Sequence, residues 1–326
     1  LDEGDDITCT ITNDDVAPKL TIVKDPTNDN GGNAKPDDFL LTVGGTAVLS
    51  GEENSYLSNT AYAIDETQLA GYTFISITGD KKCPEILKGT ITLDEGDDIT
   101  CTITNDDVAP GLHLRKIVTN DNGGTALPTA WTLTAAGLTP LSGSSPVDSD
   151  TTFKAGTYTL GESGPSGYAA SSWSCTGVTN IDNSITLGVG QSATCTITND
   201  DNVPSLILNK VLVNDNGGTA LESAWTLTAT GIGTSPNILS GLGASGNNDV
   251  VSGANFKAGI YTLSESAGPL GYAHNQWSCV KNSAQAVTDN TITINLGDTA
   301  TCTITNDDVA PGLHLRKIVT NDNGGT

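Results

Sequence analysis

The stretch TCTITNDDVAPGLHLRKIVTNDNGGT runs from Thr100 to Thr125, and the same letters return from Thr301 to Thr326. Its central phrase, CTITNDD, occurs four times in the chain, with the cysteine at Cys9, Cys101, Cys195 and Cys302. Each copy is followed by a VAP or VP segment and then by a run of alternating apolar residues. We therefore interpret the stretch as a junction, in which one repeat ends and the next begins.

These junctions divide the chain into three whole repeats and two flanking pieces. The repeats are residues 19–110, 111–204 and 205–311. Residues 1–18 are expected to be the last strand of a truncated preceding domain, and residues 312–326 the first strand of a truncated following domain. Because a repeat of about a hundred residues can bury its own core, the sequence predicts independent domains arranged as beads on a string.

The residue pattern within the repeats predicts an all-β fold. Threonine-rich segments alternate with apolar residues, and clusters of Gly, Asn and Asp separate them. This pattern is typical of antiparallel strands joined by tight turns, so we expect an Ig-like β-sandwich of roughly seven short strands in each repeat. The Gly/Ser/Asn-rich insertion at residues 232–254 is expected to form a surface loop.

Charge and composition exclude several classes of function. The formal net charge is −24, from 14 basic and 38 acidic residues, which disfavours binding to nucleic acid or to anionic membranes. The sequence has no apolar run long enough to cross a bilayer, so no membrane insertion is expected in this region. No Ser/His/Asp set, phosphate-binding glycine loop or carboxylate pair recurs, so we predict that the chain is not an enzyme acting on an external substrate.

The cysteines within the whole repeats come in pairs. The spacing contains no C-x-x-C motif, and His113, His274 and His314 do not cluster near the cysteines, which argues against a zinc or redox site. We predict one disulfide in each repeat and hence an extracellular location. The pairs are Cys83 with Cys101, Cys175 with Cys195, and Cys279 with Cys302.

Strand parity directs three polar residues of each repeat toward the core. A lysine ends the apolar face of the first strand, an asparagine that of the last strand, and a glutamate that of the strand AYAIDE, TYTLGE or IYTLSE. The three sets are Lys24, Glu66 and Asn105; Lys116, Glu162 and Asn199; Lys210, Glu265 and Asn306. On the same parity, Phe39, Trp131 and Trp225 are expected in the core.

One reaction uses all three of these residue types. Apolar surroundings favour a neutral lysine amine and a protonated glutamic acid, and the acid can polarise an asparagine amide. Attack by the amine then releases ammonia and leaves an isopeptide bond between the first and last strands. The alternative is a Lys–Glu salt bridge at the edge of the core, with the asparagine capping the exit turn.

The repeats resemble a known family. An opening strand ending in Lys, phrases such as YTLGESGPSGY, YAIDETQLAGY and YTLSESAGPLGY, and a last strand ending in Asn are similar to the collagen-adhesin B-type domains of bacterial surface adhesins and pilins. These domains are also called CnaB-like, SpaA-like or prealbumin-like. The resemblance implies a prealbumin-like sandwich, and it implies that the three Lys–Glu–Asn sets are autocatalytic isopeptide sites.

Carboxylates concentrate where each repeat ends. If the first and last strands are parallel, the first turn lies at the same end of the domain as the NDD exit segment. Carboxylate and amide oxygens are the ligands that calcium selects, so calcium is the candidate ion, although an ordinary turn beside solvated aspartates explains the same residues. The candidate ligands are Asn28, Asp29, Asn30, Asp106 and Asp107; Asp121, Asp200 and Asp201; and Asp215, Asp307 and Asp308.

Two functions remain open from the sequence. The favoured one is the structural repeat region of an extracellular stalk, fibre or filament at a cell surface, whose partners are neighbouring copies of the same repeats. The alternative is an adhesin whose repeat loops bind a host, matrix or mineral ligand.

Overall fold

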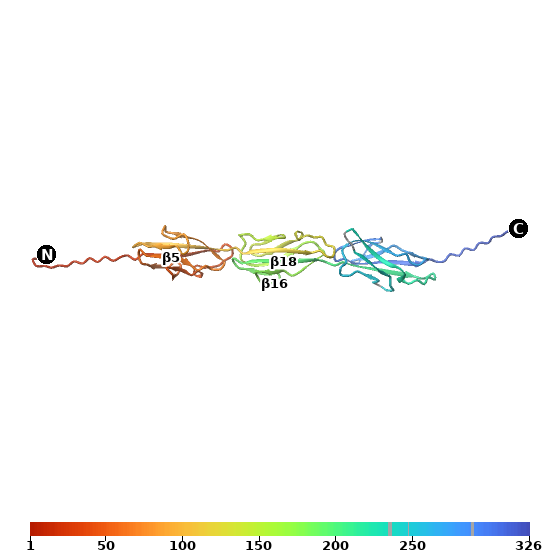
Figure 1. The fold of residues 1–326 in the computed structure, drawn as a ribbon, viewed down its shortest axis with the longest axis horizontal. Helices are drawn as coiled ribbons and strands as arrows, with labels where there is room; N and C mark the ends of the chain where they lie inside the picture. The colour runs from red at the N-terminus through yellow and green to blue at the C-terminus, as the bar shows by residue number, and fades with distance from the viewer. Residues whose placement is uncertain (234–236, 247, 288–289) are drawn as a thin grey trace. The chain divides into compact units, whose positions relative to one another are not determined.

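The computed structural model describes residues 1–233, 237–246, 248–287 and 290–326. Strands form nearly all of the regular structure in these residues, together with three short 3-10 turns. The predicted all-β fold class is confirmed. In Figure 1, β5 lies in the first repeat and β16 and β18 lie in the second.

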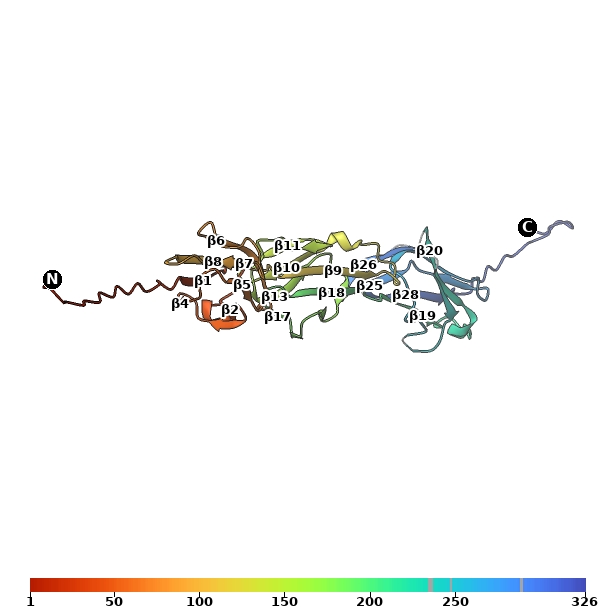
Figure 2. The same cartoon turned by 60° about the vertical axis from the view of Figure 1, so that its left-hand side comes forward.

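The first repeat consists of two four-stranded sheets. One has the order β4-β1-β8-β6 and the other β3-β2-β5-β7, and Figure 2 labels all of these strands except β3. The strands are β1 (Lys19–Thr27), β2 (Leu41–Val43), β3 (Thr46–Val48), β4 (Glu53–Ser55), β5 (Ala61–Glu66), β6 (Tyr72–Gly79), β7 (Thr90–Thr92) and β8 (Asp98–Asp107), with a 3-10 turn η1 (Pro36–Asp38).

The second repeat has the same plan with added short strands. Its sheets follow the orders β12-β9-β18-β14, with β15 also on β18, and β11-β10-β13-β17-β16. The elements are β9 (Gly111–Thr119), η2 (Pro128–Ala130), β10 (Thr132–Ala136), β11 (Leu141–Ser144), β12 (Val147–Asp148), β13 (Gly156–Ser163), β14 (Tyr168–Ala170), β15 (Ser174–Thr176), β16 (Asn180–Ile181), β17 (Ser184–Leu187) and β18 (Ser192–Asp201).

The third repeat contains the sheets β22-β19-β28-β25-β26, with β24 also on β28, and β21-β20-β23-β27. Its elements are β19 (Ser205–Val213), η3 (Glu222–Ala224), β20 (Thr226–Ile232), β21 (Ile238–Leu242), β22 (Val250–Val251), β23 (Gly259–Glu265), β24 (Tyr272–His274), β25 (Ser278–Lys281), β26 (Ala284–Val287), β27 (Thr291–Ile294) and β28 (Thr299–Asp308).

The insertion at 232–254, which we expected to be a loop, contains two of these strands. β21 pairs with the edge of β20, and β22 pairs with β19. An open sheet edge supplies free N–H and C=O groups, and this segment satisfies them. Residues 234–236 and 247 of the insertion lie outside the described residues.

The last strand of each repeat alternates buried and outward-facing residues, as its sequence pattern predicts. In β8, Ile99, Cys101, Ile103, Asn105 and Asp107 are buried in strict alternation, and three threonines and Asp106 lie between them on the other face. A period of two places one set on the core side, and β-branched threonine suits the opposite face. The alternation carries two polar residues, an amide and a carboxylate, into the interior.

The first and last strands of a repeat are parallel neighbours. In the first repeat β1 pairs with β8, with Lys24 opposite Ile103 and Pro26 opposite Asn105. In the third repeat β19 pairs with β28 in the same register, with Lys210 opposite Ile304. The asparagine therefore lies on the last strand, two residues after the residue that is opposite the lysine. Both side chains point to the same face of the sheet, so the long lysine side chain can reach the asparagine.

The core lies between the two sheets of each sandwich. In the first repeat Leu20 and Ile22 of β1 pack in one cluster with Leu41, Val43 and Ile64 of the other sheet. An equivalent cluster fills the third repeat. Burying one such aliphatic side chain stabilises the fold by about 1.5–3 kcal/mol, so each repeat has its own source of stability.

The two flanking segments form no strand among the residues that the structure describes. Residues 1–18 and 312–326 are largely exposed and have no neighbouring strand to pair with. None of the described helices has the length and hydropathy needed to cross a bilayer.

Candidate cross-linking and cation sites

The structure brings the lysine, glutamate and asparagine of the first repeat together. The Lys24 Nζ atom lies 3.0 Å from Oε2 of Glu66, and both side chains are fully buried. The Asn105 amide donates a hydrogen bond of 2.6 Å to Oε1 of the same glutamate. One carboxyl group thus contacts both the amine and the amide, and Asn105 contacts this glutamate rather than capping the exit turn.

The other two repeats contain the same ion pair. Lys116 Nζ lies 2.6 Å from Glu162 Oε2, and Lys210 Nζ lies 3.1 Å from Glu265 Oε2. All three lysine side chains have no exposed surface, whereas these two glutamates keep a small exposed fraction. The corresponding asparagines, Asn199 and Asn306, are also buried.

Burial lowers the pKa of Lys24, Lys116 and Lys210 below the usual 10.5, and the paired glutamates only partly oppose this. The neutral, nucleophilic form of each amine is therefore more accessible than in water. An aromatic ring covers each amine, with the ring centroid 4.3 Å from Nζ for Phe39 and 4.9 Å for Trp131 and Trp225. These rings lie in the core and exclude water from the amine.

Two buried oxygens of this lysine–glutamate–asparagine site lack hydrogen-bond partners, Oε2 of Glu66 and Oδ1 of Asn105. The contact between Lys24 and Glu66 is close, but its angles are not those of a hydrogen bond. If Glu66 carries a proton and the Asn105 amide is rotated by 180°, the acid can donate a hydrogen bond to Oδ1 of Asn105. Amide orientation is open to such a turn because its nitrogen and oxygen are nearly equivalent in shape.

In the third repeat the site borders an open cleft of about 330 Å³. Glu265 and Asn306 line this cleft with Trp225 and Tyr272. A small neutral molecule leaving the asparagine would have a path to solvent here.

Each repeat contains one of the three expected disulfides. Cys83 is bonded to Cys101, Cys175 to Cys195, and Cys279 to Cys302. In the second and third repeats the two cysteines lie directly opposite one another on antiparallel strands. Cys9 is a free, exposed cysteine.

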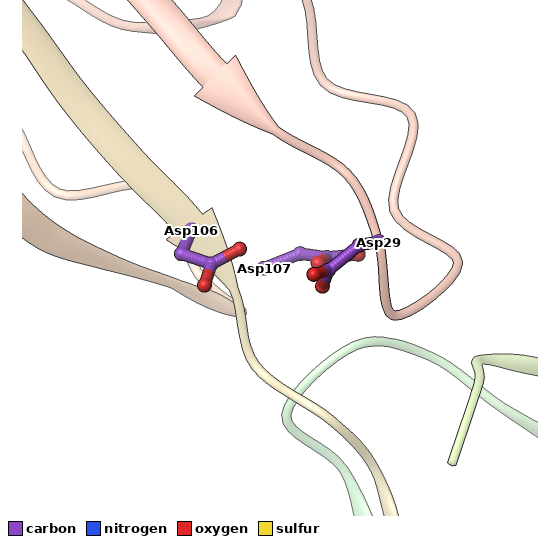
Figure 3. A group of neighbouring side chains, drawn as sticks. All are labelled: Asp29, Asp106 and Asp107. Atoms are coloured by element: carbon purple, nitrogen blue, oxygen red, sulfur yellow. The ribbon is translucent and has the colours of Figure 1, made fainter. Parts of the chain in front are cut away.

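The acidic candidates also converge. Asp29, Asp106 and Asp107 each place one carboxylate oxygen within 4.8 Å of the others, and Figure 3 shows Asp29 of the turn beside the end of β8. The other repeats assemble the equivalent groups Asp121, Asp200 and Asp201, and Asp215, Asp307 and Asp308. Burial and the charges of Asp29 and Asp107 raise the pKa of Asp106.

The last aspartate of each group already has protein donors. The Asp107 carboxylate accepts hydrogen bonds from the backbone N–H groups of Asn30, at 2.8 Å, and Gly32, at 2.6 Å. Asp201 and Asp308 accept the equivalent bonds in their repeats. For Asp308 burial would raise the pKa, but the N–H donors outweigh it and lower the pKa. This aspartate therefore ties the first turn to the end of the last strand through backbone N–H donors.

A tyrosine also holds this turn, and the sequence analysis did not predict its role. We call Asp107, Tyr72 and Asn28, with their equivalents in the other repeats, the turn clamp. The Tyr72 hydroxyl donates to Oδ1 of Asn28 and accepts from the Ala34 N–H at 3.0 Å. The Asn28 amide donates to the Ala34 carbonyl at 3.1 Å. Tyr168 with Asn120 and Tyr272 with Asn214 repeat the arrangement. The recurring G-Y pair is the signal that could have identified it.

Fold and site together define a class of protein, tandem prealbumin-like β-sandwiches with a buried lysine and glutamate beneath parallel first and last strands. A family model described as a prealbumin-like fold domain, SpaA-type, matches residues 15–103, 107–197 and 201–304. The chain belongs to this family. A sequence search of curated proteins gave no match.

A solved structure shows a similar fold. The chain is similar to the Bacillus anthracis TIE protein, with a TM-score of 0.51 and 16% identity over 90% of this chain and 51% of that one. The chain thus spans about half the length of that protein. The major pilin subunit of Bacillus cereus matches at 12% identity over 89% of this chain and 99% of the pilin, with a TM-score of 0.35. The likeness to the TIE protein, at this identity, shows a similar fold alone.

Proposed function

We propose that this chain is the structural repeat region of an extracellular stalk or filament, in which each repeat is locked by covalent bonds. The observation that carries the proposal is the buried lysine–glutamate pair that recurs in all three repeats beneath the terminal strands. A buried ion pair contributes little to stability by itself, so its repetition needs another explanation. Membership of the prealbumin-like family supports the same conclusion.

The proposed lock is an isopeptide bond. The neutral Nζ of Lys24 attacks Cγ of Asn105, and a new C–N bond forms while the bond from Cγ to Nδ2 breaks. Glu66 first donates its proton to the amide oxygen, then takes a proton from the attacking amine and passes it to Nδ2, which leaves as ammonia. The oxygen then returns its proton to Glu66, which leaves a neutral amide and a protonated glutamic acid. The reaction happens once in each repeat, and its rate comes mainly from the pose that the fold imposes.

The disulfides support the location and the role. Disulfides persist in oxidising environments, which favours an extracellular protein. Because repeats follow one another in a single chain, the natural partners of each repeat are its neighbours and further copies of the chain. The adhesin alternative rests on composition of the loops, and the described residues add no observation in its favour.

Intact mass under reducing conditions tests the proposal on the full chain. We expect a mass below the sequence mass by one ammonia for each repeat. Glu66→Gln should restore the mass of one ammonia, because the substituted side chain cannot relay the proton. Asp65→Asn is the matched control, since this neighbouring carboxylate faces away from the core and should leave the ammonia loss unchanged. A chain whose mass equals that of its reduced sequence refutes the cross-link.

A further inference from the structure

At the junction of the first and second repeats, the first turn of one repeat contacts a loop of the next. The Asn30 side chain is buried, and its Nδ2 atom donates hydrogen bonds to the carbonyl oxygens of Thr151 and Phe153, at 3.0 and 3.4 Å. The Asn30 carbonyl accepts a hydrogen bond of 2.7 Å from the Ala155 N–H. Among the described residues, this side chain therefore donates only to the second repeat.

The junction of the second and third repeats has the same contacts. The Asn122 side chain is also buried, and its Nδ2 atom donates to the carbonyl oxygens of Ala254 and Phe256, at 3.2 and 3.4 Å. Its own carbonyl accepts from the Ala258 N–H at 2.7 Å. Two junctions that share one donor and the same acceptors indicate a specific docking arrangement.

One residue of each linker is bonded to both repeats. The Val108 N–H donates to the Gly71 carbonyl of the first repeat, at 2.9 Å, and the Val108 carbonyl accepts from the Gly190 N–H of the second, at 2.7 Å. Asn202 makes the equivalent pair of bonds at the next junction. A Cβ atom added at Gly71 would lie 2.5 Å from Cγ2 of Val189, so this glycine packs directly against the following repeat. We call the turn asparagine, the glycine of the G-Y pair and this linker residue the exit end of a repeat.

The third repeat shows its exit end without a docked loop among the described residues. Asn216 is exposed, and its Nδ2 atom donates at 3.1 Å to the carbonyl of Asp308 in its own repeat. A Cβ atom added at Gly217 or Gly271 would meet nothing within 4 Å, and Leu270 beside them is fully exposed. The third repeat thus separates what the turn does within a repeat from what it does at a junction.

We propose that the exit end of a repeat is a docking surface for the repeat that follows it, and that the turn asparagine determines which repeats fit. The partner must offer an entry loop in which two backbone carbonyls and one N–H are free to bond. Both docked loops have the sequence Phe-Lys-Ala-Gly, at residues 153–156 and 256–259. The inference goes beyond the proposed stalk, because docking needs no isopeptide bond.

The first repeat lacks such an entry loop. When Tyr62 is aligned with Tyr158, Asn59 stands where the second repeat has Ala155. The Asn59 N–H already donates to the Leu93 carbonyl of its own repeat, at 2.7 Å. The exit end of the third repeat should therefore accept a repeat with a Phe-Lys-Ala-Gly loop, and it should not accept a repeat whose loop resembles that of the first.

Hydrogen–deuterium exchange of the full chain tests each junction separately. The Ala155 and Ala258 N–H groups should exchange slowly in the unaltered chain, because docking shields them. Asn30→Asp replaces the amide donor with a carboxylate, which has no N–H to donate to two carbonyl oxygens. We expect it to speed exchange of the Ala155 N–H about tenfold or more, since buried acceptors lose their donor, and to leave Ala258 unchanged. Asn122→Asp should produce the opposite pattern.

Two control variants come from the third repeat. Asn216→Asp makes the same change in a turn with no docked loop, so neither alanine N–H should respond. Gly31→Ala and Gly217→Ala both strain the turn, because the φ values are +91° and +96°, but only a Cβ at Gly31 would lie 2.8 Å from the Ala155 nitrogen. Only Gly31→Ala should therefore speed exchange at Ala155. Slow exchange in β8 confirms that the first repeat of each variant is folded.

The entry loop is tested from its own side. Ala155→Asn introduces the residue of the first repeat at the close approach to Gly31, and it should speed exchange of the Gly190 N–H. The proposal is overturned if the Ala155 N–H of the unaltered chain exchanges like an exposed amide, or if Asn30→Asp leaves its rate unchanged. An equal effect of Asn216→Asp on Ala155 also overturns it, because the substitution would then act without docking.

Discussion

Each repeat contains one fully buried lysine side chain that is paired with a glutamate. Lys24 loses its hydration among apolar side chains, and a single glutamate is its only charged partner in the described structure. Such a pair costs free energy when it is desolvated, and removing one partner leaves an uncompensated charge. A covalent bond between Lys24 and Asn105 would remove this cost, because the resulting amide is neutral.

Blocking the cross-link exposes the titration of this lysine. In Asn105→Ala the amine cannot react, and burial still holds its folded pKa below the unfolded value of 10.5. Between these two values the unfolded chain binds more protons than the folded chain, so stability rises with pH across this window. We expect the urea midpoint of this variant to increase as the pH is raised toward 10.5.

The double variant Asn105→Ala with Lys24→Met is the control for this pH effect. It lacks the titrating amine but keeps the other ionisable groups of the chain. The difference between the two midpoints should therefore grow smaller as the pH rises. A difference that is constant with pH would show that Lys24 is not the group responsible.

Residue positions differ in how well the sequence alone predicts them. The inward direction of Lys24, Glu66 and Asn105 follows from the period of two, which holds along any regular strand. The contacts of Tyr72 do not follow, because its hydroxyl reaches a turn 44 residues earlier in the chain. Only closure of the sandwich brings these two segments together.

At the scale of elements, the first turn and the last strand form a single structural unit. Asp107 at the end of β8 and Tyr72 at the start of β6 both hold the turn that follows β1. Bonds from N–H groups to a carboxylate are stronger than those between neutral groups. The last aspartate of the NDD phrase therefore has a structural role, because it accepts hydrogen bonds from backbone N–H groups of the first turn. From the sequence, this phrase indicated only calcium ligands or solvated aspartates.

Gly32 occupies the closest point of this turn clamp. A Cβ atom at this position would lie 2.7 Å from Oδ2 of Asp107 and would also collide with the Tyr72 hydroxyl. We expect Gly32→Ala to destabilise the first repeat by about 1–3 kcal/mol, the usual range for overpacking. Urea unfolding followed for that repeat measures it. Gly253→Ala is the control, because a Cβ atom at that position meets nothing within 4 Å. Gly45→Ala would not serve, because Gly45 has a φ of +83° and the substitution would also strain the backbone.

Calcium remains a prediction for the carboxylate groups beside this turn. Mutual repulsion contributes to the raised pKa of Asp106, and a bound cation would relieve it. If calcium binds the folded state alone, a concentration of 100 times Kd adds about 2.7 kcal/mol of stability, so a chelator should lower Tm.

Asp29→Asn separates the ion from the turn clamp. The exposed Asp29 carboxylate belongs to the acidic group, whereas the clamp uses Asp107. The variant should lose the calcium response while its stability in chelator stays close to that of the unaltered chain. A Tm that neither calcium nor chelator moves would show that the clamp holds the turn without an ion.

The insertion of the third repeat shows where element prediction fails. Its Gly, Ser and Asn content is typical of a loop, yet Ile238–Leu242 forms β21 on the open edge of β20. Sheet edges recruit a segment through its backbone groups, which every residue offers. Composition therefore carries little information about such a strand.

For the whole molecule, internal repetition made the fold class and the disulfide pairing predictable. Three copies of one pattern showed which features recur, and cysteines that recur in pairs indicated the bonds that the structure contains. The added strands of the second and third repeats did not recur in all copies and were missed. Repetition is therefore a strong guide to what the repeats share and a poor guide to how they differ.

The parallel pairing of β1 with β8 decides how a repeat behaves under tension. Chain enters at the start of β1 and leaves at the end of β8, at opposite ends of the ladder, so an applied force shears all of its hydrogen bonds together. A bond from Lys24 to Asn105 would carry that force directly from one strand to the other. The 80 residues from 25 to 104 (104 − 24 = 80) would then bear no load. Roughly 260 Å of extended chain would then remain folded in each such repeat, and the chain would transmit tension without lengthening.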